Sequence, residues 1–205
     1  MGILTELFYL PHIEYFAAIE GHGILLLDDL ERFQKQSLRN RTSLLLANKV
    51  ETLSVPVYEG NKKKPYKDIQ IDYGQKWLNI HLRGIQSAYG KAPFFEYYFP
   101  YIEEVYSQKL QYLIDLNAAL LTVCLKLLRM DIEVKFLSET SESIEYSDIR
   151  GLIRAKEGFE TRDFYQSEPY RQLFGVEFVP NLSVIDLLFC EGPEAMSLIK
   201  GSKKK

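Results

Sequence analysis

The chain has 205 residues, is 46% hydrophobic and carries a formal net charge of −3. This length and apolar fraction predict a single domain with a sizeable core, and the charge argues against a nucleic-acid binder, which usually has a basic face. No apolar run reaches the ~18 residues of a membrane-spanning helix and the N-terminus lacks the features of a signal peptide, so we expect a cytoplasmic protein without stable membrane insertion. Cys124 and Cys190 lie in apolar helical patterns and are predicted to be free, buried thiols.

Residues 7–41 predict a compact unit of two strands and one helix. The first strand is expected over Leu7–Leu10 and ends at Pro11, because proline lacks the N–H that a central strand donates. A short amphipathic helix is expected over residues 13–20. Ile24–Leu27 is then a continuous apolar run, which is typical of a strand that is buried on both faces.

Polar side chains around this unit form the predicted site. Asp28 and Asp29 end the second strand, where open α/β sheets place their ligands, and with His12 they are the predicted catalytic residues. Arg39 and Arg41 lie on the same side of an extended chain, so we expect them to form a fork for phosphate or carboxylate oxygens. The predicted substrate-binding residues are Tyr9, Tyr15, Lys35, Gln36, Arg39, Asn40, Arg41 and Asn181.

The same residues also have structural interpretations. A lone histidine such as His12 is more often a hydrogen-bonded structural residue, neighbouring carboxylates are often only solvated, and two arginines can pair with local Asp and Glu. The stretch from His12 to Tyr15 resembles the H-x-G-H start of nucleotidyltransferases, with Tyr15 in place of the second histidine, and there the helix N-terminus holds phosphate. A P-loop, a zinc signature, a Rossmann glycine fingerprint and a Ser-His-Asp triad are absent, so no cofactor is indicated and no metal ligand is assigned.

The next segment predicts a β-hairpin. Its strands are expected over Thr42–Leu46 and Glu51–Val57, on either side of a turn at residues 47–49. The following loop carries Lys62–Lys64, which is either a solvated charge run or a patch for phosphate or an anionic lipid head group. Ile69–Ile71 alternates and predicts one more short strand.

The middle of the chain predicts helices. One is expected from Trp77 to Tyr89, and a long, deeply buried helix from Glu103 to Met130. Between them, aromatic residues crowd the stretch 89–101, either as core or interface residues or as a platform that stacks sugars or bases. Ile132–Phe136 then predicts a strand.

Residues 138–172 change character and are rich in Ser, Glu, Asp and Arg. Because this segment is too long for an ordinary connection, we interpret it as a mobile insertion, which serves either as a linker or as a lid over a site. Asn181 is expected to cap the apolar helix that follows it. A short helix over 194–200 and a frayed basic tail over 201–205 complete the chain.

These elements predict an α/β fold. We expect a small Rossmann-like sheet from the N-terminal half with an added hairpin, packed by several helices from the C-terminal half. The whole chain, residues 1–205, is expected to form one domain that includes the insertion at 138–172.

Five ordered segments resemble the WbqC-like protein family. They are Tyr9-Leu10-Pro11 with Tyr15-Phe16, Lys35-Gln36 with Arg39-Asn40-Arg41, Leu53–Val57, Pro93–Tyr98, and Phe178–Phe189 with Gly192-Pro193-Glu194. The resemblance covers nearly all of the chain except 138–172 and is strongest to the branch from the Bacteroidetes, although many members have Trp or Pro where this chain has His12. It implies a bacterial cytoplasmic protein of the kind found among genes for lipopolysaccharide O-antigen and other surface glycans, some members being labelled as transferases that modify sugars.

Three functions are consistent with these features. The first is a transferase that acts on a nucleotide-linked or amino sugar, a small-molecule substrate bearing phosphate or carboxylate. The second is a binding or scaffold protein of glycan assembly, which predicts a large apolar surface patch and no deep polar pocket. The third is a metal-dependent hydrolase that uses Asp28 and Asp29. The sequence indicates no oligomeric state.

Overall fold

The structure is a computed structural model that describes residues 1–205 except 48, 61, 63, 141–143, 176 and 205. A parallel four-stranded sheet has the order β5-β2-β1-β6. Its strands are Gly2–Thr5 (β1), Ile24–Leu27 (β2), Glu133–Phe136 (β5) and Tyr146–Asp148 (β6). A separate antiparallel hairpin consists of Arg41–Leu45 (β3) and Val50–Ser54 (β4). The predicted α/β class, with a small parallel sheet and an added hairpin, is confirmed.

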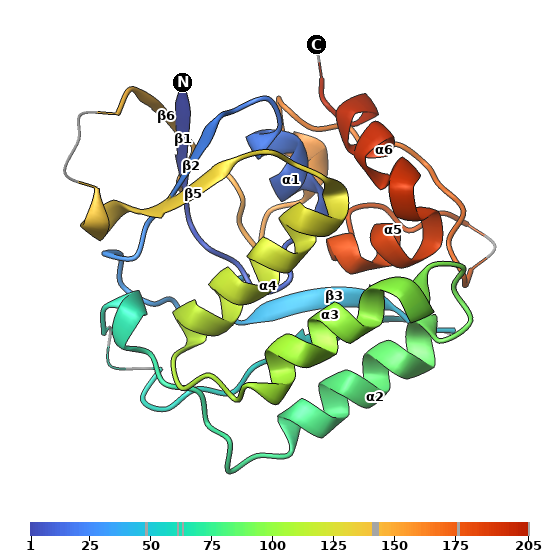
Figure 1. The fold of residues 1–205 in the computed structure, drawn as a ribbon, viewed down its shortest axis with the longest axis horizontal. Helices are drawn as coiled ribbons and strands as arrows, with labels where there is room; N and C mark the ends of the chain where they lie inside the picture. The colour runs from blue at the N-terminus through green and yellow to red at the C-terminus, as the bar shows by residue number, and fades with distance from the viewer. Residues whose placement is uncertain (48, 61, 63, 141–143, 176, 205) are drawn as a thin grey trace.

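Helices pack around these strands. They are Ile13–Ile19 (α1), Trp77–Tyr89 (α2), Phe95–Ser107 (α3), Leu113–Leu128 (α4), Val184–Glu191 (α5) and Ala195–Gly201 (α6). Single 3₁₀ turns occur at Tyr66–Asp68 (η1), Leu137–Glu139 (η2), Phe159–Thr161 (η3) and Gly192–Glu194 (η4). Figure 1 shows α4 crossing the middle of the molecule between the parallel sheet and the α2–α3 pair, with α5 and α6 gathered near the C-terminus. No helix in the part of the chain that the structure describes is both long and apolar enough to cross a membrane.

The opening unit confirms the predicted helix and second strand but corrects the first strand. The strand is Gly2–Thr5, and Leu7–Leu10 instead leaves the sheet and runs through the core. Tyr9 N–H donates to the Leu38 carbonyl at 2.9 Å rather than to a neighbouring strand of the sheet. Residues 2–10 contain two apolar runs on either side of Thr5 and Glu6, and the longer run, Leu7–Leu10, is the one that lies outside the sheet.

The prediction of one long helix over Glu103–Met130 is wrong, because a non-helical segment separates α3, which ends at Ser107, from α4, which begins at Leu113. Lys109 adopts a left-handed conformation with φ 49°, and the segment after it hydrogen-bonds to a distant loop. Ile71 N–H donates to the Gln111 carbonyl and Leu113 N–H donates to the Ile69 carbonyl, both at 2.9 Å. The short strand predicted at Ile69–Ile71 is thus a pair of isolated bridges, to residues 112 and 57.

The predicted insertion at 138–172 contributes to the fold. Its residues Tyr146–Asp148 form β6, an edge strand that pairs with β1. Ile153 and Tyr165 are buried, so the described part of the segment is packed against the domain. Its mobility stays a prediction.

The frayed tail predicted over 201–205 is wrong over 201–204, while residue 205 lies outside the described residues. Ser202 is buried, and its carbonyl accepts from Gln166 N–H at 2.8 Å. Lys203 Nζ donates to the Glu20 carboxylate at 2.8 Å. These two contacts hold the residues after α6 against Gln166 and Glu20.

Several smaller predictions have clear outcomes. Cys124 and Cys190 are free and buried, as predicted. The aromatic stretch 89–101 supplies core residues, since Phe95 stacks on Phe99 with ring centroids 4.6 Å apart. Of the predicted lysine run, Lys63 lies outside the described residues, and its neighbours 62 and 64 both form ion pairs with Glu59.

Gly192, which follows α5, provides a test of the fold. Its backbone has φ 53° and ψ −120°, and a Cβ there would lie 2.5 Å from Phe94 Cδ1. We expect Gly192→Ala to lower the free energy of unfolding by about 1–3 kcal/mol, measured by urea denaturation. Gly23→Ala is the matched control, because a Cβ at Gly23 meets nothing within 4 Å. Equal losses in both variants would contradict the close approach of Gly192 to Phe94.

Candidate functional site

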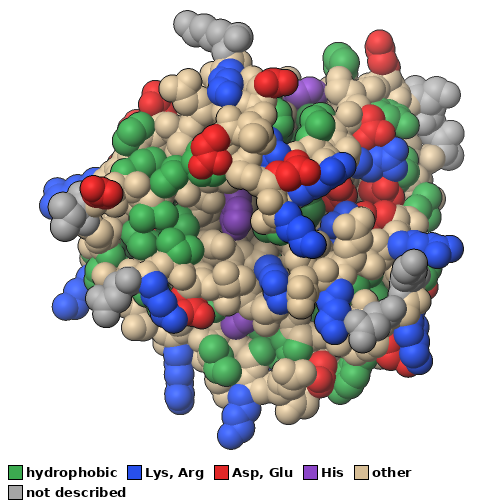
Figure 2. Space-filling view, turned by 180° about the vertical axis from the view of Figure 1, so that it is seen from behind, with side chains coloured by type: hydrophobic (Ala, Val, Ile, Leu, Met, Phe, Trp, Pro, Cys, Tyr) green, Lys and Arg blue, Asp and Glu red, His purple; other side chains and the backbone are tan. Residues whose placement is uncertain are grey.

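Two neighbouring pockets lie between the N-terminal unit, the hairpin and the segment 151–159. The first, the Glu6 pocket, has a volume of about 450 Å³ and is lined by Glu6, Phe8, residues 34–39, Gly151 and residues 153–157. The second, the Arg41 pocket, has a volume of about 310 Å³ and is lined by His12, Glu14, Gln36, Leu38, residues 41–43, Thr52, residues 154 and 155, Glu157, Phe159 and Asn181. Figure 2 shows Lys and Arg side chains gathered around a hollow near the centre of the rear face, with a histidine at its border.

The pockets are continuous along a shared wall. Gln36, Leu38, Arg154, Ala155 and Glu157 line both of them. Three of these residues belong to the segment 138–172, so this segment forms part of the wall of both pockets, and its role as a lid stays a prediction. A ligand that spans the shared wall would reach both pockets at once.

The structure brings six of the predicted site residues to these pockets. His12, Arg41 and Asn181 line the Arg41 pocket, Lys35 and Arg39 line the Glu6 pocket, and Gln36 lines both. Pattern reasoning missed the acidic lining residues Glu6, Glu14 and Glu157 and the basic residues Arg154 and Lys156.

Three other predicted residues lie away from the pocket walls. Tyr9 is fully buried, and its hydroxyl shares hydrogen bonds with His81 Nδ1 at 2.8 Å and with Tyr106. Tyr15 is also fully buried, and burial raises the pKa of its phenol well above the usual value. Asn40 Nδ2 donates to the Val55 carbonyl at 3.0 Å, which holds the entry of the hairpin.

The two aspartates are occupied by protein donors. Asp28 accepts from the N–H groups of residues 30 and 31 at 3.0 and 3.1 Å, and from Arg150 Nη1 at 2.7 Å. Asp29 accepts from Ser138 N–H at 3.0 Å and from its hydroxyl. Both carboxylates are buried, and neither lines the two pockets. We therefore leave them out of the site proposed below.

The predicted arginine fork does not act as one group. Arg39 is buried against acids: its Nε donates to Glu31 Oε1 at 2.6 Å, its Nη2 donates to the other oxygen of Glu31, and Nη2 lies 3.5 Å from Glu6 Oε1. Burial alone would lower the pKa of Arg39, but the hydrogen bonds and charge of Glu31 outweigh it and raise the pKa. Arg39 thus forms the local ion pairs that were the structural interpretation of these residues.

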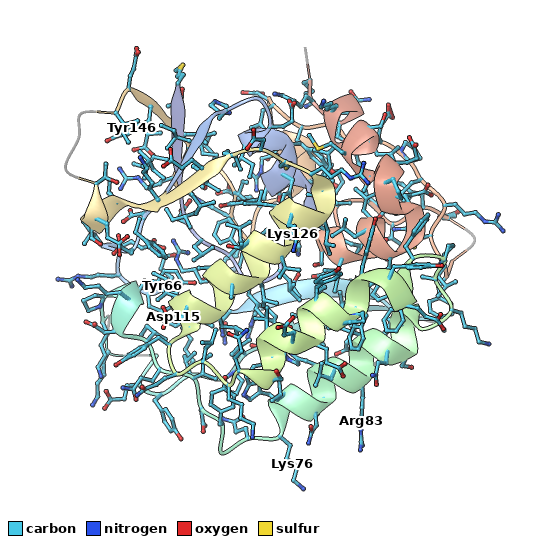
Figure 3. The ribbon with its side chains drawn as sticks, viewed as in Figure 1. Tyr66, Lys76, Arg83, Asp115, Lys126 and Tyr146 are labelled. Atoms are coloured by element: carbon cyan, nitrogen blue, oxygen red, sulfur yellow. The ribbon has the colours of Figure 1, made fainter. Side chains whose placement is uncertain are left out.

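Asn117 of helix α4 holds the backbone of Arg39 in place. Asn117 is fully buried, and its Nδ2 donates to the Arg39 carbonyl and to the Tyr66 hydroxyl, both at 2.6 Å. The Tyr66 hydroxyl in turn donates to the Leu7 carbonyl at 3.1 Å. Figure 3 shows Tyr66 beside the first half of α4. These bonds hold the N-terminal unit and the loop before β3 in one position.

Arg41 and His12 are different, because polar atoms of both are buried without a partner. Arg41 Nε and His12 Nε2 make no hydrogen bond within the described structure, and both residues line the Arg41 pocket. Burial lowers the pKa of His12 to about 4, so its imidazole is neutral at pH 7. The Arg41 pocket is therefore lined by two residues that each carry a buried polar atom without a partner, the donor Nε of Arg41 and the imidazole Nε2 of His12.

The backbone conformation of Leu10 sets the position at which His12 enters the structure. Leu10 has φ 40°, a conformation that β-carbon-bearing residues rarely adopt. Its carbonyl accepts from Thr42 Oγ1 at 2.8 Å and from Ser183 Oγ at 3.0 Å, which hold this turn between β3 and the start of α5. The chain then enters α1 with His12 as the N-cap residue.

The N-terminus of α1 is closed to an anion. Ile13 N–H donates to the Leu182 carbonyl at 3.0 Å, and Tyr15 N–H donates to the His12 carbonyl at 3.0 Å. Between them, Glu14 N–H donates to Asn181 Oδ1 at 3.0 Å. The phosphate-holding helix start that the H-x-G-H comparison predicts is thus occupied by the protein itself. Asn181 caps α1 rather than α5, whose N-cap residue is Ser183, so its predicted capping role is corrected.

A buried polar cluster fastens the segment 150–162 over the pockets. Glu14 and Arg162 form an ion pair with 3.0 Å between Oε2 and Nε, and their side chains are only 4% and 5% exposed. Asn181 Nδ2 donates to the second Glu14 oxygen at 3.0 Å. Arg162 Nη2 donates to the carbonyls of Arg154 and Glu157 at 3.4 and 3.3 Å, which shapes the loop that lines both pockets.

The Glu14–Arg162 pair generates a stability prediction. Arg162→Met leaves the Glu14 carboxylate buried without its counter-charge, so we expect a loss of about 3–5 kcal/mol in urea denaturation. Arg154→Met is the matched control, because the side chain of Arg154 is 62% exposed and its pair with Glu157 contributes about 0–1 kcal/mol. Adding Glu14→Gln to Arg162→Met is expected to recover part of the loss. A cost for Arg162→Met no larger than that for Arg154→Met would contradict this role.

Two histidines generate a pH prediction. Burial lowers the pKa values of His12 and His81 to about 4, against about 6.5 in an unfolded chain. The folded state therefore binds fewer protons, so their contribution is present above pH 6.5 and is lost as the pH falls towards 4. Each contributes at most about 3 kcal/mol, from a difference of about 2.5 pKa units. Urea denaturation from pH 7 to 4 should show a shallower pH dependence in His12→Gln and in His81→Gln; unchanged slopes would contradict the lowered pKa values.

The sequence was compared with protein-family models, curated proteins and solved structures. A model of the WbqC-like protein family matches residues 8–160 and 145–198. The matched residues include 138–172, which the resemblance seen in the sequence left out. No curated protein and no solved structure matches the chain.

Proposed function

The chain belongs to the WbqC-like protein family, and from this membership and the pocket chemistry we propose that it is a transferase of surface-polysaccharide biosynthesis. Its substrate is a nucleotide-linked or amino sugar that carries phosphate or carboxylate, as in the assembly of O-antigen on lipopolysaccharide. We place the protein in the cytoplasm, where nucleotide-linked sugars are made. Family membership supports involvement in surface-polysaccharide biosynthesis, and the reaction type rests on the site alone.

The observation that carries this proposal is the unpartnered Arg41 in a pocket with a neutral histidine. Arg41 Nε is buried and makes no hydrogen bond with the described residues. An arginine fork matches phosphate and carboxylate oxygens, and a buried unpaired donor costs about 1–3 kcal/mol that a bound anion would recover. In this proposal Arg41 is the anchor for the anionic group of the substrate.

His12 supplies the second role. Its Nε2 is buried and unpartnered in the same pocket. An anion held by Arg41 would favour the imidazolium and raise the pKa of His12 from about 4 towards neutrality. His12 then takes the proton of an attacking hydroxyl or amine as general base, while Arg41 neutralises the charge that develops on the leaving group.

The two alternative functions have less support. A scaffold protein predicts a broad apolar patch in place of polar cavities, whereas both pockets here contain charged side chains. A metal-dependent hydrolase needs a cluster of ligands, and no group of three or more His, Cys, Asp or Glu side chains that could hold a metal occurs among the residues described. The oxygens of Asp28 and Asp29 are also taken by protein donors.

Ligand binding tests the anchor. We expect UDP and UDP-N-acetylglucosamine to stabilise the protein in a thermal-shift titration, by about 2.7 kcal/mol at a concentration 100 times the dissociation constant. Arg41→Ala should weaken this binding about 10- to 100-fold, because the charge-assisted hydrogen bonds contribute about 1.5–3 kcal/mol. Arg83→Ala is the matched control, since Arg83 points away from the body of the protein on α2 (Figure 3).

Two results would contradict the proposal. One is the absence of a shift with any phosphate- or carboxylate-bearing sugar in the wild-type protein. The other is an equal effect of Arg41→Ala and Arg83→Ala on the measured affinity, which would place the anion elsewhere.

A further inference from the structure

Glu6 lines the Glu6 pocket and carries one carboxylate oxygen that has no hydrogen-bond partner within the described structure. Its side chain is 9% exposed and lies directly after the last residue of β1. Oε1 accepts from Gly151 N–H at 2.9 Å and lies 3.5 Å from Arg39 Nη2. Oε2 is buried and has no hydrogen-bond partner within the described structure. A carboxylate oxygen accepts hydrogen bonds only, so this atom requires a donor from a ligand or solvent.

The charges around Glu6 restrict what that donor can be. An anionic group in direct contact with the unpaired carboxylate oxygen would be repelled by it, so the basic lining residues Arg154 and Lys156 could hold an anion only away from this oxygen. A free ammonium would meet the Arg39 guanidinium, which lies 3.5 Å from the other oxygen of the same carboxylate. A neutral hydroxyl avoids both conflicts and supplies the required donor.

Three larger apolar side chains lie among the mostly polar residues that line the Glu6 pocket, and they suit the apolar faces of a sugar ring. Phe8, Leu38 and Ile153 line the Glu6 pocket and are almost fully buried, so they form a fixed apolar wall. The cavity of about 450 Å³ lies within the ~300–1,000 Å³ range of small-molecule sites. Such sites combine apolar walls with a few placed polar groups, and a sugar presents C–H faces beside its hydroxyls.

We propose that the Glu6 pocket is a subsite for a neutral, hydroxyl-rich sugar ring, with Glu6 Oε2 accepting a hydrogen bond from one ring hydroxyl. Glu6 is then a binding and specificity-determining residue. The inference rests on the proposed function for its place in a transferase, because the shared wall at Gln36 and Arg154 connects this subsite with the Arg41 pocket. The sugar would occupy one pocket while its anionic group, or a second substrate, occupies the other.

Glu6→Gln gives a sharp test. A glutamine keeps an oxygen for Gly151 N–H and replaces the unpaired acceptor by an NH₂ donor, so the change inverts one hydrogen-bonding position. We expect glucose, galactose or N-acetylglucosamine to bind the wild-type protein in ligand-observed NMR titrations. Glu6→Gln should weaken that binding about 10- to 100-fold. Arg83→Ala is the control, because Arg83 points away from the body of the protein on α2 (Figure 3) and its loss should leave neutral-sugar binding unchanged.

A second measurement does not depend on folding of the Glu6 variant. Deoxyfluoro analogues of the bound sugar replace one hydroxyl at a time by fluorine, which cannot donate a hydrogen bond. One position should lose at least about tenfold in affinity for the wild-type protein. Failure of all three sugars to bind, equal affinity of Glu6→Gln and wild type, or no sensitive position in the analogues would each overturn the subsite. UDP binding that Arg41→Ala weakens no more than Arg83→Ala does would instead overturn the proposed function.

Discussion

The ion pair between Glu14 and Arg162 is the interaction on which the shape of the site depends. Burying two charges costs several kcal/mol per ion unless every polar group finds a partner. Here both oxygens of Glu14 have donors, in Arg162 Nε and Asn181 Nδ2, each at 3.0 Å. Arg162 also donates to the carbonyls of Arg154 and Glu157, so one side chain joins α1 to the loop that walls both pockets. This cluster therefore holds in place the loop that lines both pockets.

Three buried polar atoms without a partner, Arg41 Nε, His12 Nε2 and Glu6 Oε2, belong to residues that line the two pockets, although other such atoms lie elsewhere in the described structure. Arg39 has two acids as partners, whereas Arg41 Nε has none, although both arginines lie at the entry of the hairpin. Glu14 uses both oxygens, whereas Glu6 uses only one. An unpaired buried polar atom costs about 1–3 kcal/mol, so a fold that satisfies neighbouring groups and leaves these open has a surface suited to a polar ligand.

Hydrophobic periodicity predicted β2, α1 and the hairpin because each has its own apolar pattern and a glycine, proline or turn boundary. It misplaced β1, because the longer apolar run, Leu7–Leu10, comes after Thr5 and Glu6 and lies outside the sheet. The arginine fork failed for a related reason: β3 begins at Arg41, so the period of two did not extend back to Arg39. The pair of Glu14 with Arg162 spans 148 residues and leaves no local pattern, so only the folded chain could show it.

In our proposal, the rule that ligands bind at the carboxyl ends of parallel strands applies at β1 instead of β2. Asp28 follows β2, and Arg150 Nη1 donates to its carboxylate at 2.7 Å. Glu6 follows β1 and lines the Glu6 pocket, and its second oxygen has no hydrogen-bond partner within the described structure. The difference arises because β6 pairs with β1, and the chain after β6 passes the ends of both β1 and β2. There Arg150 donates to Asp28, which follows β2, and Gly151 N–H donates to Glu6, which follows β1. A backbone N–H satisfies only one oxygen of a carboxylate, and so the strand end next to Gly151 keeps an acceptor for a ligand.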